Sequence, residues 1–321
     1  MKKLLLITPH MSTGGLPQFV LKRVELLKDY YNILVVEYNL LAWSYVVQRN
    51  KVRDILGDNF ISLGENKEYE IINILNDFSP DIVFLEEIPE TFMPRHVIRR
   101  IYKQKRNYKI FECTHSSNSK KEVKKFFPDK FLFVSPHSCI EFKDMEIPFE
   151  LIEYPIDYKK PQKEINQEKL GLDPEYKHVV NIGLFTPGKN QKYAFEIARL
   201  LQKYKIQFHF VGNQAINFQD YWGPIMENKP ENCHIWGERL DIDTFIQSSD
   251  LHLFTSNFEL NPLAIKESLE YRIPTMFYNL STYHNKYDDE ENVTFLTGNL
   301  LEDTINLLKL LNVDYSISKT T

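Results

Sequence analysis

The stretch DLHLFTSNFELNPLAIKE, residues 250–267, predicts a strand, a loop and a helix in direct succession. The apolar run at 250–254 is typical of a buried strand. We expect a helix to begin at Pro262, because proline lacks the N–H that a first helical turn leaves unpaired. The remaining open N–H groups and the partial positive charge of a helix start favour an anion. Glu259 would lie just before this anion site, and Glu267 would lie inside the helix.

This spacing of charges suits one class of ligand in particular. A phosphate could bind at the helix start while Glu259 and Glu267 accept hydrogen bonds from hydroxyl groups on either side of it. Donors in which a sugar is joined to a nucleoside through a diphosphate have this layout. Paired acids at this spacing are also common on solvated helix faces, so the interpretation depends on the rest of the chain.

Apolar strands alternate with amphipathic helices along almost the whole chain, which is typical of parallel sheets covered on both faces. The predicted strands span residues 4–8, 33–37, 60–63, 82–85, 108–113, 131–134, 178–183, 207–211, 234–236, 251–254 and 275–278. The clearest helices span residues 16–27, 69–78, 191–204, 243–248, 262–271 and 300–311. A polar, turn-rich region at 154–174 separates the two series.

We therefore predict an α/β fold of two doubly wound, Rossmann-like domains that face a central cleft. Residues 1–155 would form an N-terminal acceptor domain, and residues 156–321 a C-terminal donor domain. Such sheets bind ligands outside the carboxyl ends of their strands, so the cleft is the expected site.

Composition excludes several classes of protein. The chain of 321 residues is 43% hydrophobic and 26% charged, which is typical of a globular protein. No apolar run of about 18 residues predicts a membrane span, and the run 1–7 is too short for the core of a signal peptide. Cys113, Cys139 and Cys233 are widely spaced and predict neither a disulfide framework nor a zinc site. The expected location is the cytoplasm.

The net charge of −5 argues against a nucleic-acid partner for the whole chain. Residues 95–130 differ, because they hold twelve basic and three acidic side chains. Such a patch could dock peripherally on anionic membrane lipids, or hold an acidic acceptor or a nucleic acid. The alternative is an ordinary solvated helix face.

Three further positions follow predicted strands. Gly14 and Gly15 come after the first strand and would let the backbone approach a ligand closely. They do not form the G-x-G-x-x-G pattern, and Glu37 is only a loose candidate for the accompanying acid, so a nicotinamide enzyme is rejected. His115 follows the strand at 108–113 and could contact a sugar hydroxyl. The alternatives are an ordinary turn and a structural histidine.

Lys189 stands in the loop between the first strand and helix of the second series, where its point charge could hold a phosphate. The alternative is a solvated surface lysine. Asp241 and Asp243 resemble a metal-binding D-x-D, but their position favours a helix cap instead. No metal site is predicted.

Together these positions resemble the retaining glycosyltransferases of the GT-B architecture, in the GT4-like family (glycosyltransferase group 1). The family pattern of two glutamates with an intervening proline is met by Glu259, Pro262 and Glu267. Val211-Gly212-Asn213 resembles a strand end of that family. Gly14-Gly15 resembles its glycine pair, and His115 its sugar-binding histidine.

The resemblance implies a transfer of sugar from a nucleotide-diphosphate donor to a glycan or lipid-linked acceptor, as in polysaccharide biosynthesis. Glu267 would hold the ribose hydroxyls, while Glu259 and His115 would contact the transferred sugar. The implied diphosphate ligands are Lys189, the Gly14-Gly15 turn and the amides around Asn261 and Leu263. It implies no cofactor and no metal.

Two residues depart from the family pattern. Leu184 stands where the family usually has an arginine, and Arg272 where it often has a glycine. Lys192 or Arg239 could replace the missing cation. The departures leave open a non-catalytic, nucleotide-sugar-binding partner subunit. A sugar-nucleotide epimerase of similar architecture and a nucleic-acid-modifying transferase are further alternatives.

Overall fold

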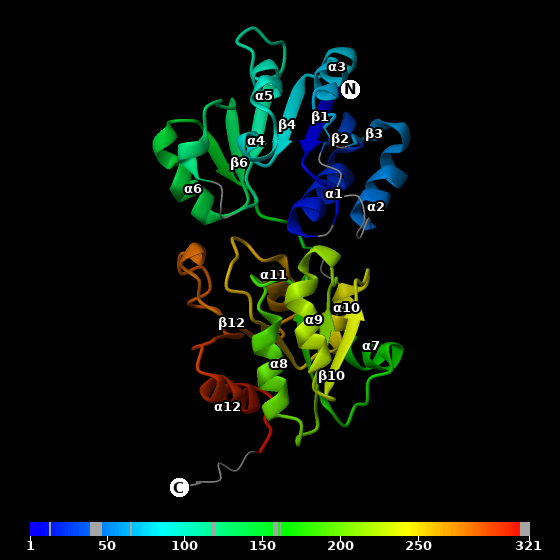
Figure 1. Cartoon of the computed structure of the whole chain (residues 1–321), viewed down its shortest axis with the longest axis vertical. Helices are drawn as coiled ribbons and strands as arrows, with labels where there is room; N and C mark the ends of the chain where they lie inside the picture. The colour runs from blue at the N-terminus through cyan, green and yellow to red at the C-terminus, as the bar shows by residue number, and fades with distance from the viewer. Residues whose placement is uncertain are drawn as a thin grey trace. The chain divides into compact units, whose positions relative to one another are not determined.

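The computed structural model describes residues 1–12, 14–38, 47–64, 66–116, 120–156, 160 and 162–314. The chain divides into two compact units, Met1–Tyr154 and Pro155–Thr321. Each unit is a parallel sheet with alternating helices, so the predicted α/β architecture of two Rossmann-like domains is confirmed (Figure 1).

The first unit contains a seven-stranded sheet in the order β3-β2-β1-β4-β5-β6-β7, with every pairing parallel. Its strands are β1 (Lys2–Thr8), β2 (Tyr31–Glu37), β3 (Phe60–Ser62), β4 (Ile82–Glu86), β5 (Lys109–Cys113), β6 (Lys130–Phe133) and β7 (Phe149–Leu151). Its helices are α1 (Gly15–Leu27), α2 (Val47–Leu56), α3 (Glu70–Phe78), α4 (Pro89–Phe92), α5 (Arg95–Ile101) and α6 (Pro136–Phe142).

The second unit contains a six-stranded parallel sheet in the order β10-β9-β8-β11-β12-β13. Its strands are β8 (Lys177–Ile182), β9 (Ile206–Val211), β10 (Cys233–Gly237), β11 (Leu251–Phe254), β12 (Thr275–Phe277) and β13 (Val293–Phe295). Its helices are α7 (Lys163–Leu170), α8 (Gln191–Leu200), α9 (Gln219–Glu227), α10 (Ile242–Ser248), α11 (Leu263–Glu270) and α12 (Leu300–Leu310).

The central strands are apolar on both sides because helices cover both faces of each sheet. In the second unit, Phe208 and Phe210 of β9 pack in one core with α8 and α12. Val180 and Val211 face the other way, toward Phe245 of α10. In the first unit, α3 and α5 cover the face that carries alternate residues of β1, β2 and β4.

The strand orders place a topological switch point in each unit, where the chain leaves one half of the sheet for the other. The switch lies between β1 and β4 in the first unit and between β8 and β11 in the second. Ligands of open α/β sheets bind outside the carboxyl ends of the strands at such points. A ligand is therefore expected at the loops that follow these four strands.

Several predicted boundaries were wrong. The edge strands β7 and β13 were missed, since each has three residues and neither is fully buried, so no apolar run marks them. Helix α7 lies inside the region predicted as turns. Helix α8 ends at Leu200 rather than at 204. Pro262 caps α11 in an extended conformation, φ −68° and ψ 117°, and is not its first helical residue.

None of the helices in the described part of the chain is long and apolar enough to cross a membrane.

Candidate functional site

The loop after β8 packs tightly against the end of β9. A Cβ atom added to Gly212 would lie 1.9 Å from the carbonyl oxygen of Gly183, which no side chain allows. The aliphatic stem of Lys189 covers Gly183, with its Cδ 3.4 Å from where a Cβ would stand. Glycine at 212 therefore fixes the start of the loop that carries Lys189.

Lys189 and Glu259 form an ion pair between the loops that follow the adjacent strands β8 and β11. The Ser256 hydroxyl lies 2.7 Å from the same Glu259 oxygen and donates to it. The ammonium group of Lys189 also stands 5.1 Å from the centre of the Phe254 ring. The structure thus brings together two residues that the sequence placed 70 positions apart.

Hydrogen bonds to backbone carbonyl oxygens hold these two loops together. Thr255 Oγ1 donates to the carbonyl oxygen of Lys189 at 3.1 Å, and the Asn257 N–H donates to that of Gly188 at 3.0 Å. On the other side, Thr282 Oγ1 donates to the carbonyl oxygen of Glu259 at 2.6 Å. Glu259 is therefore positioned through its backbone as well as through its carboxylate.

Helix α11 begins directly after this loop. Leu263 is its first residue, and Asn261 is half-buried two residues earlier. The first N–H groups of a helix have no intrahelical acceptor, so the amides at Leu263 and Ala264 can receive an anion. The helix starts one residue later than the sequence suggested, and an anion site at its first turn stays a prediction.

Glu267 lies one turn into α11 and carries an unusual carboxyl group. Burial, with a smaller contribution from the negative charge of Asp243 on α10, raises the pKa of Glu267 to about 7. No hydrogen bond or ion pair to this carboxylate was found within the described ranges. A half-buried acid of this kind is available to hydroxyl donors from a ligand.

Buried polar groups surround the ion pair. His252 is fully buried, and its Nδ1 lies 2.8 Å from the Ser268 hydroxyl. Burial, with a contribution from Lys189, lowers the pKa of His252 to about 3, so its ring is neutral. Its Nε2 and the hydroxyls of Tyr283 and Tyr287 have no hydrogen-bond partner among the described residues. Burial and then the Glu259 charge raise the pKa of both tyrosines.

In the first unit, His115 lies two residues beyond the end of β5. Its Nε2 is 3.1 Å from Oε2 of Glu86, whose other oxygen accepts a 2.7 Å hydrogen bond from Arg23. The Phe19 ring of α1 meets the imidazole edge-on at 5.3 Å. Burial alone would lower the pKa of His115, but its contacts with Cys113 and Glu86 outweigh that effect and raise it to about 10.

The glycine pair lies at the start of α1. Gly14 caps the helix with φ 117°, a conformation that other residues rarely adopt, and Gly15 is its first residue. Both are exposed. Phe19, one turn along α1, links this helix start to His115. Thr13, within the same loop, lies outside the described residues.

Glu37 at the end of β2 is fully buried and already engaged. Arg49 binds both of its oxygens at 2.8 and 2.6 Å, Ser62 donates to it at 2.8 Å, and the Met11 N–H donates at 2.7 Å. Its carboxylate therefore ties loops together and does not face a ribose.

Asp241 of the D-x-D pair has a structural role. Asp241 takes the N-cap position of α10, as expected, but makes no side-chain capping bond. Its two oxygens instead accept 2.9 Å hydrogen bonds from Arg239. Arg239, one candidate for the missing family arginine, is thereby held by Asp241. Arg272 adopts φ 56°, which explains a preference for glycine at its position.

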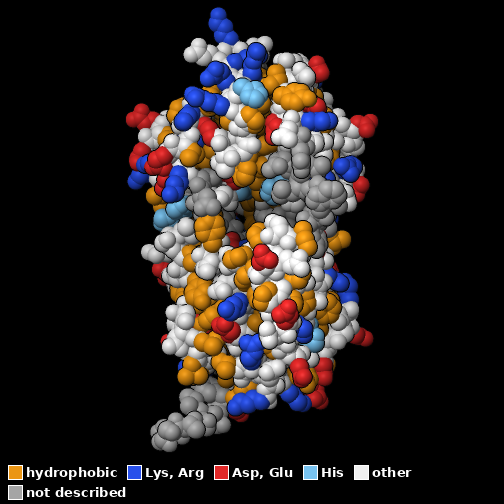
Figure 2. Space-filling model, viewed as in Figure 1, with side chains coloured by type: hydrophobic (Ala, Val, Ile, Leu, Met, Phe, Trp, Pro, Cys, Tyr) orange, Lys and Arg blue, Asp and Glu red, His pale blue; other side chains and the backbone are white. Residues whose placement is uncertain are grey.

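The basic segment 95–130 is only partly a surface patch. Figure 2 shows Lys and Arg side chains gathered at the upper end of the first unit, over α5. The exposed members there are Arg95, Arg99, Arg100, Lys103 and Lys105. Lys124, by contrast, is fully enclosed and bound to Glu90 and Glu112 at 2.8–2.9 Å. It cannot contribute to a docking surface.

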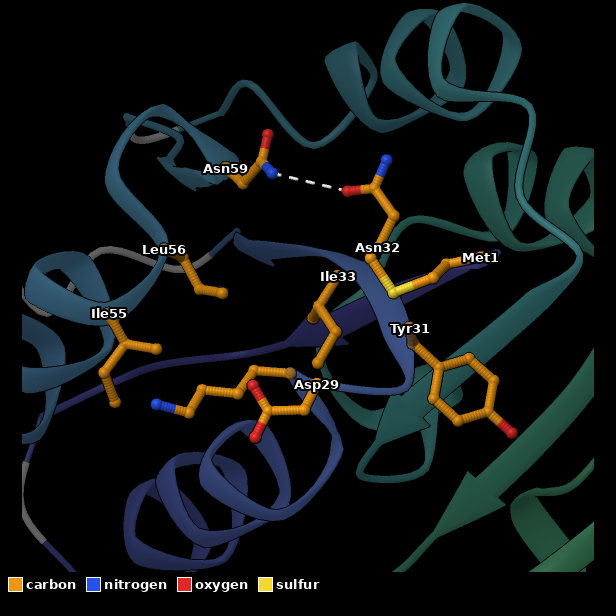
Figure 3. A pocket seen from close by; sticks show the side chains of 9 residues that line it. Met1, Asp29, Tyr31, Asn32, Ile33, Ile55, Leu56 and Asn59 are labelled. Carbon is orange, nitrogen blue, oxygen red and sulfur yellow. Dashed lines mark hydrogen bonds between the residues drawn. The ribbon is translucent and has the colours of Figure 1, made fainter.

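A pocket lies at the opposite edge of the first sheet (Figure 3). Its walls come from the amino ends of β1 and β2, including Met1 and Tyr31, and from Ile55 and Asn59. The amide of Asn59 approaches Asn32 across it at 3.5 Å. Because it is remote from the carboxyl ends of the strands, it is not part of the candidate site.

Sequence reasoning missed the residues that position the candidates. Glu86 was not singled out, although it ends a buried strand at the sheet edge where ligands bind, and that position was a usable signal. Arg23 gave no signal, because it lies within the pattern of an ordinary amphipathic helix. The roles of Ser256 and Thr282 depend on contacts between loops and could not be predicted.

Residues 162–310 match the family model described as Glycosyl transferases group 1. These residues make up most of the second unit, which carries Lys189, Glu259 and Glu267. No curated protein sequence matches the chain.

Solved structures share the fold over nearly the whole chain. HepE from Anabaena, in complex with UDP and glucose, superposes with a TM-score of 0.75 at 15% identity, covering 96% of this chain and 90% of that one. TarM from S. aureus, solved with UDP and fondaparinux, superposes with a TM-score of 0.71 at 11% identity, covering 98% of this chain and 93% of that one. Sucrose-phosphate synthase from Thermosynechococcus elongatus superposes with a TM-score of 0.69 at 12% identity, covering 96% of this chain and 90% of that one. The fold is that of the GT-B glycosyltransferases.

Proposed function

We propose that the chain is a retaining, metal-independent glycosyltransferase of the GT4-like family. It would move a sugar from a nucleotide-diphosphate donor to a glycan or lipid-linked acceptor. The observation that carries the proposal is the arrangement of the second unit. Lys189, Glu259 and the open start of α11 occupy neighbouring loops at the switch point, and Glu267 follows inside the helix.

Each residue has a role that its chemistry supports. The ammonium of Lys189 and the first amides of α11, from Leu263, would hold the diphosphate and stabilise the charge that develops as it leaves. Asn261 lies beside these amides. Glu267 would accept hydrogen bonds from the ribose hydroxyls, because its carboxylate is half-buried and available.

The Lys189–Glu259 ion pair would hold both side chains in place before a donor binds. A bound diphosphate would compete with Glu259 for the lysine, and the released carboxylate would then accept hydrogen bonds from the sugar. The unpartnered hydroxyls of Tyr283 and Tyr287 lie within the influence of the same carboxylate. They support a site that is completed by a polar ligand.

The first unit would supply the sugar contact of His115 and the diphosphate contact of the Gly14-Gly15 turn. Glu86 and Phe19 hold the histidine ring in one orientation, which a positioned contact requires. The solved HepE and TarM complexes contain UDP, which makes uridine nucleotides the first donors to test.

The exposed basic side chains on α5 and after it would meet a negatively charged acceptor or an anionic membrane surface. Lys103 and Lys105 extend the patch beyond the helix, so it is wider than one helical face.

Release of the nucleoside diphosphate tests the proposal. The full chain is incubated with UDP-, GDP- and ADP-sugars, with and without glycan or lipid-linked acceptors, and with a chelator present. Lys189→Ala and Glu267→Ala should abolish turnover while the chain stays folded. Lys203→Ala, an exposed lysine beyond α8 at the opposite end of the unit, is the matched control. Wild-type turnover in both site variants would disprove the assignment.

One observation favours a second candidate, a non-catalytic subunit that binds nucleotide sugars. Leu184 leaves the loop without the usual arginine, and Arg239 is held by Asp241. Binding of a donor with no turnover and no hydrolysis under any acceptor condition would support this reading.

A further inference from the structure

A second cluster of reactive side chains lies where β4 and β5 end side by side. Glu86 and Cys113 are register partners on these parallel strands, and His115 follows two residues later. The carboxylate, thiol and imidazole of the three residues offer ligand atoms that all lie within 4.8 Å of one another. Glu86 and Cys113 are fully buried, and the His115 side chain keeps 9% of its surface exposed.

The geometry points to a divalent-metal site: we propose that Glu86, Cys113 and His115 together bind Zn²⁺. Thiolate, imidazole and carboxylate are the three ligand types that zinc takes from proteins. The 3.1 Å separation of His115 Nε2 and Glu86 Oε2 is close to the roughly 3.3 Å that separates two ligands in a tetrahedral site with the usual Zn–N and Zn–O bond lengths. This pair therefore already has the separation of two zinc ligands, and the Cys113 sulfur lies within 4.8 Å of both atoms.

The surroundings hold the ligands as metal sites require. Arg23 binds the other oxygen of Glu86 at 2.7 Å and so fixes the direction of the carboxylate. The Phe19 ring limits rotation of the imidazole. The backbone N–H of His115 donates to Glu87 at 3.1 Å, which anchors the turn that presents the ring.

The positive charge of Arg23 does not prevent binding. The ion would displace the thiol proton of Cys113 and the proton that His115 shares with Glu86. Two protons leave as one Zn²⁺ enters, so the net charge of the cluster stays the same. Arg23 keeps its own oxygen of Glu86 throughout.

The spacing of the cysteines gave no sign of this site, because its ligands come from two strands and not from a short C-x-x-C segment. The metal would act as an inhibitor and not as a cofactor. It would hold the imidazole of His115, to which the proposed function, on which this consequence depends, assigns a sugar contact.

Metal binding can be measured without any enzyme assay. The full chain is titrated with Zn²⁺ in competition with a chromophoric chelator, and then with Co²⁺, whose bond to a thiolate gives a charge-transfer absorption in the near ultraviolet. We expect one ion per chain and a thiolate–Co²⁺ band. Cys113→Ser should lose the band and at least 100-fold in Zn²⁺ affinity, and Cys139→Ser, with the half-buried cysteine of α6, should lose neither.

His115→Gln is the second variant, should the serine substitution at the fully buried position 113 unfold the chain. It should keep Cys113 but weaken Zn²⁺ binding by at least tenfold. Unchanged affinity in either folded variant, or a Co²⁺ complex without the thiolate band, would overturn the proposal. Zn²⁺ binding in a chain that binds no nucleotide sugar would leave this site standing and refute only the proposed function.

Discussion

Replacing Glu267 by glutamine should stabilise the ligand-free protein and lower its affinity for a donor. The carboxyl group of Glu267 has its pKa raised from an ordinary 4.5 to about 7. Above pH 7 the folded chain must therefore hold a charge that burial and Asp243 both disfavour. At 1.36 kcal/mol for each pKa unit, this costs up to roughly 3 kcal/mol of folding free energy.

The sign of the pH dependence follows from the raised pKa. The stability that Glu267 contributes is fully present below pH 4.5, where it is protonated in both states, and is lost as the pH rises through 7. Glutamine carries no charge. The unfolding free energy of Glu267→Gln should therefore exceed that of the wild type by about 3 kcal/mol at pH 8, and the gap should fall to about 1 kcal/mol at pH 5.

Urea denaturation at half-unit steps between pH 5 and pH 8 measures this gap. Glu270→Gln, on the exposed side of the same helix, is the control and should show no such trend. The same proteins are then titrated with a donor, where Glu267→Gln should bind at least tenfold more weakly. A pH-independent gap, or a glutamine variant less stable than the wild type at pH 8, would refute the reasoning.

Two other predictions concern the scaffold of the second unit. Trp236 donates to Nδ1 of His209 at 3.1 Å, so His209 must donate from Nε2 to His178 at 3.0 Å and stay neutral. Burial, and then the neighbouring histidines, lower its pKa to about 3, and stability is lost as the pH falls below 6.5. Between pH 7 and pH 5, the unfolding free energy of the wild type, measured by urea denaturation, should fall by about 2 kcal/mol more than that of His209→Gln. Equal losses would contradict a neutral, buried His209. Gly212→Ala should lower the unfolding free energy by several kcal/mol, because its Cβ would lie 1.9 Å from the carbonyl oxygen of Gly183. An unchanged melting temperature would contradict that packing.

The sequence predicted what depends on local pattern. The apolar strands, the helix after Pro262 and the candidates Lys189 and Glu259 follow from periodicity and from residues placed at strand ends. The contact between Lys189 and Glu259 could be expected once β8 and β11 are neighbours, because parallel strands bring their carboxyl ends to one edge.

What the sequence could not predict depends on which strands pair and how loops pack. Glu86, Cys113 and His115 converge only because β4 pairs with β5 in a register that aligns Glu86 with Cys113. Lys124 appeared to belong to a basic surface, but it is enclosed by Glu90 and Glu112. Charge composition alone does not show which lysines are neutralised in the interior.

Donor binding is measured most directly by calorimetric titration of the full chain with UDP, UDP-glucose and their GDP and ADP counterparts. We expect saturable binding of one nucleoside diphosphate or its sugar, with an affinity that falls at least tenfold in Lys189→Ala and in Glu267→Gln and is unchanged in Lys203→Ala. Absence of binding by every nucleotide, or equal affinity in the wild type and both site variants, would contradict it.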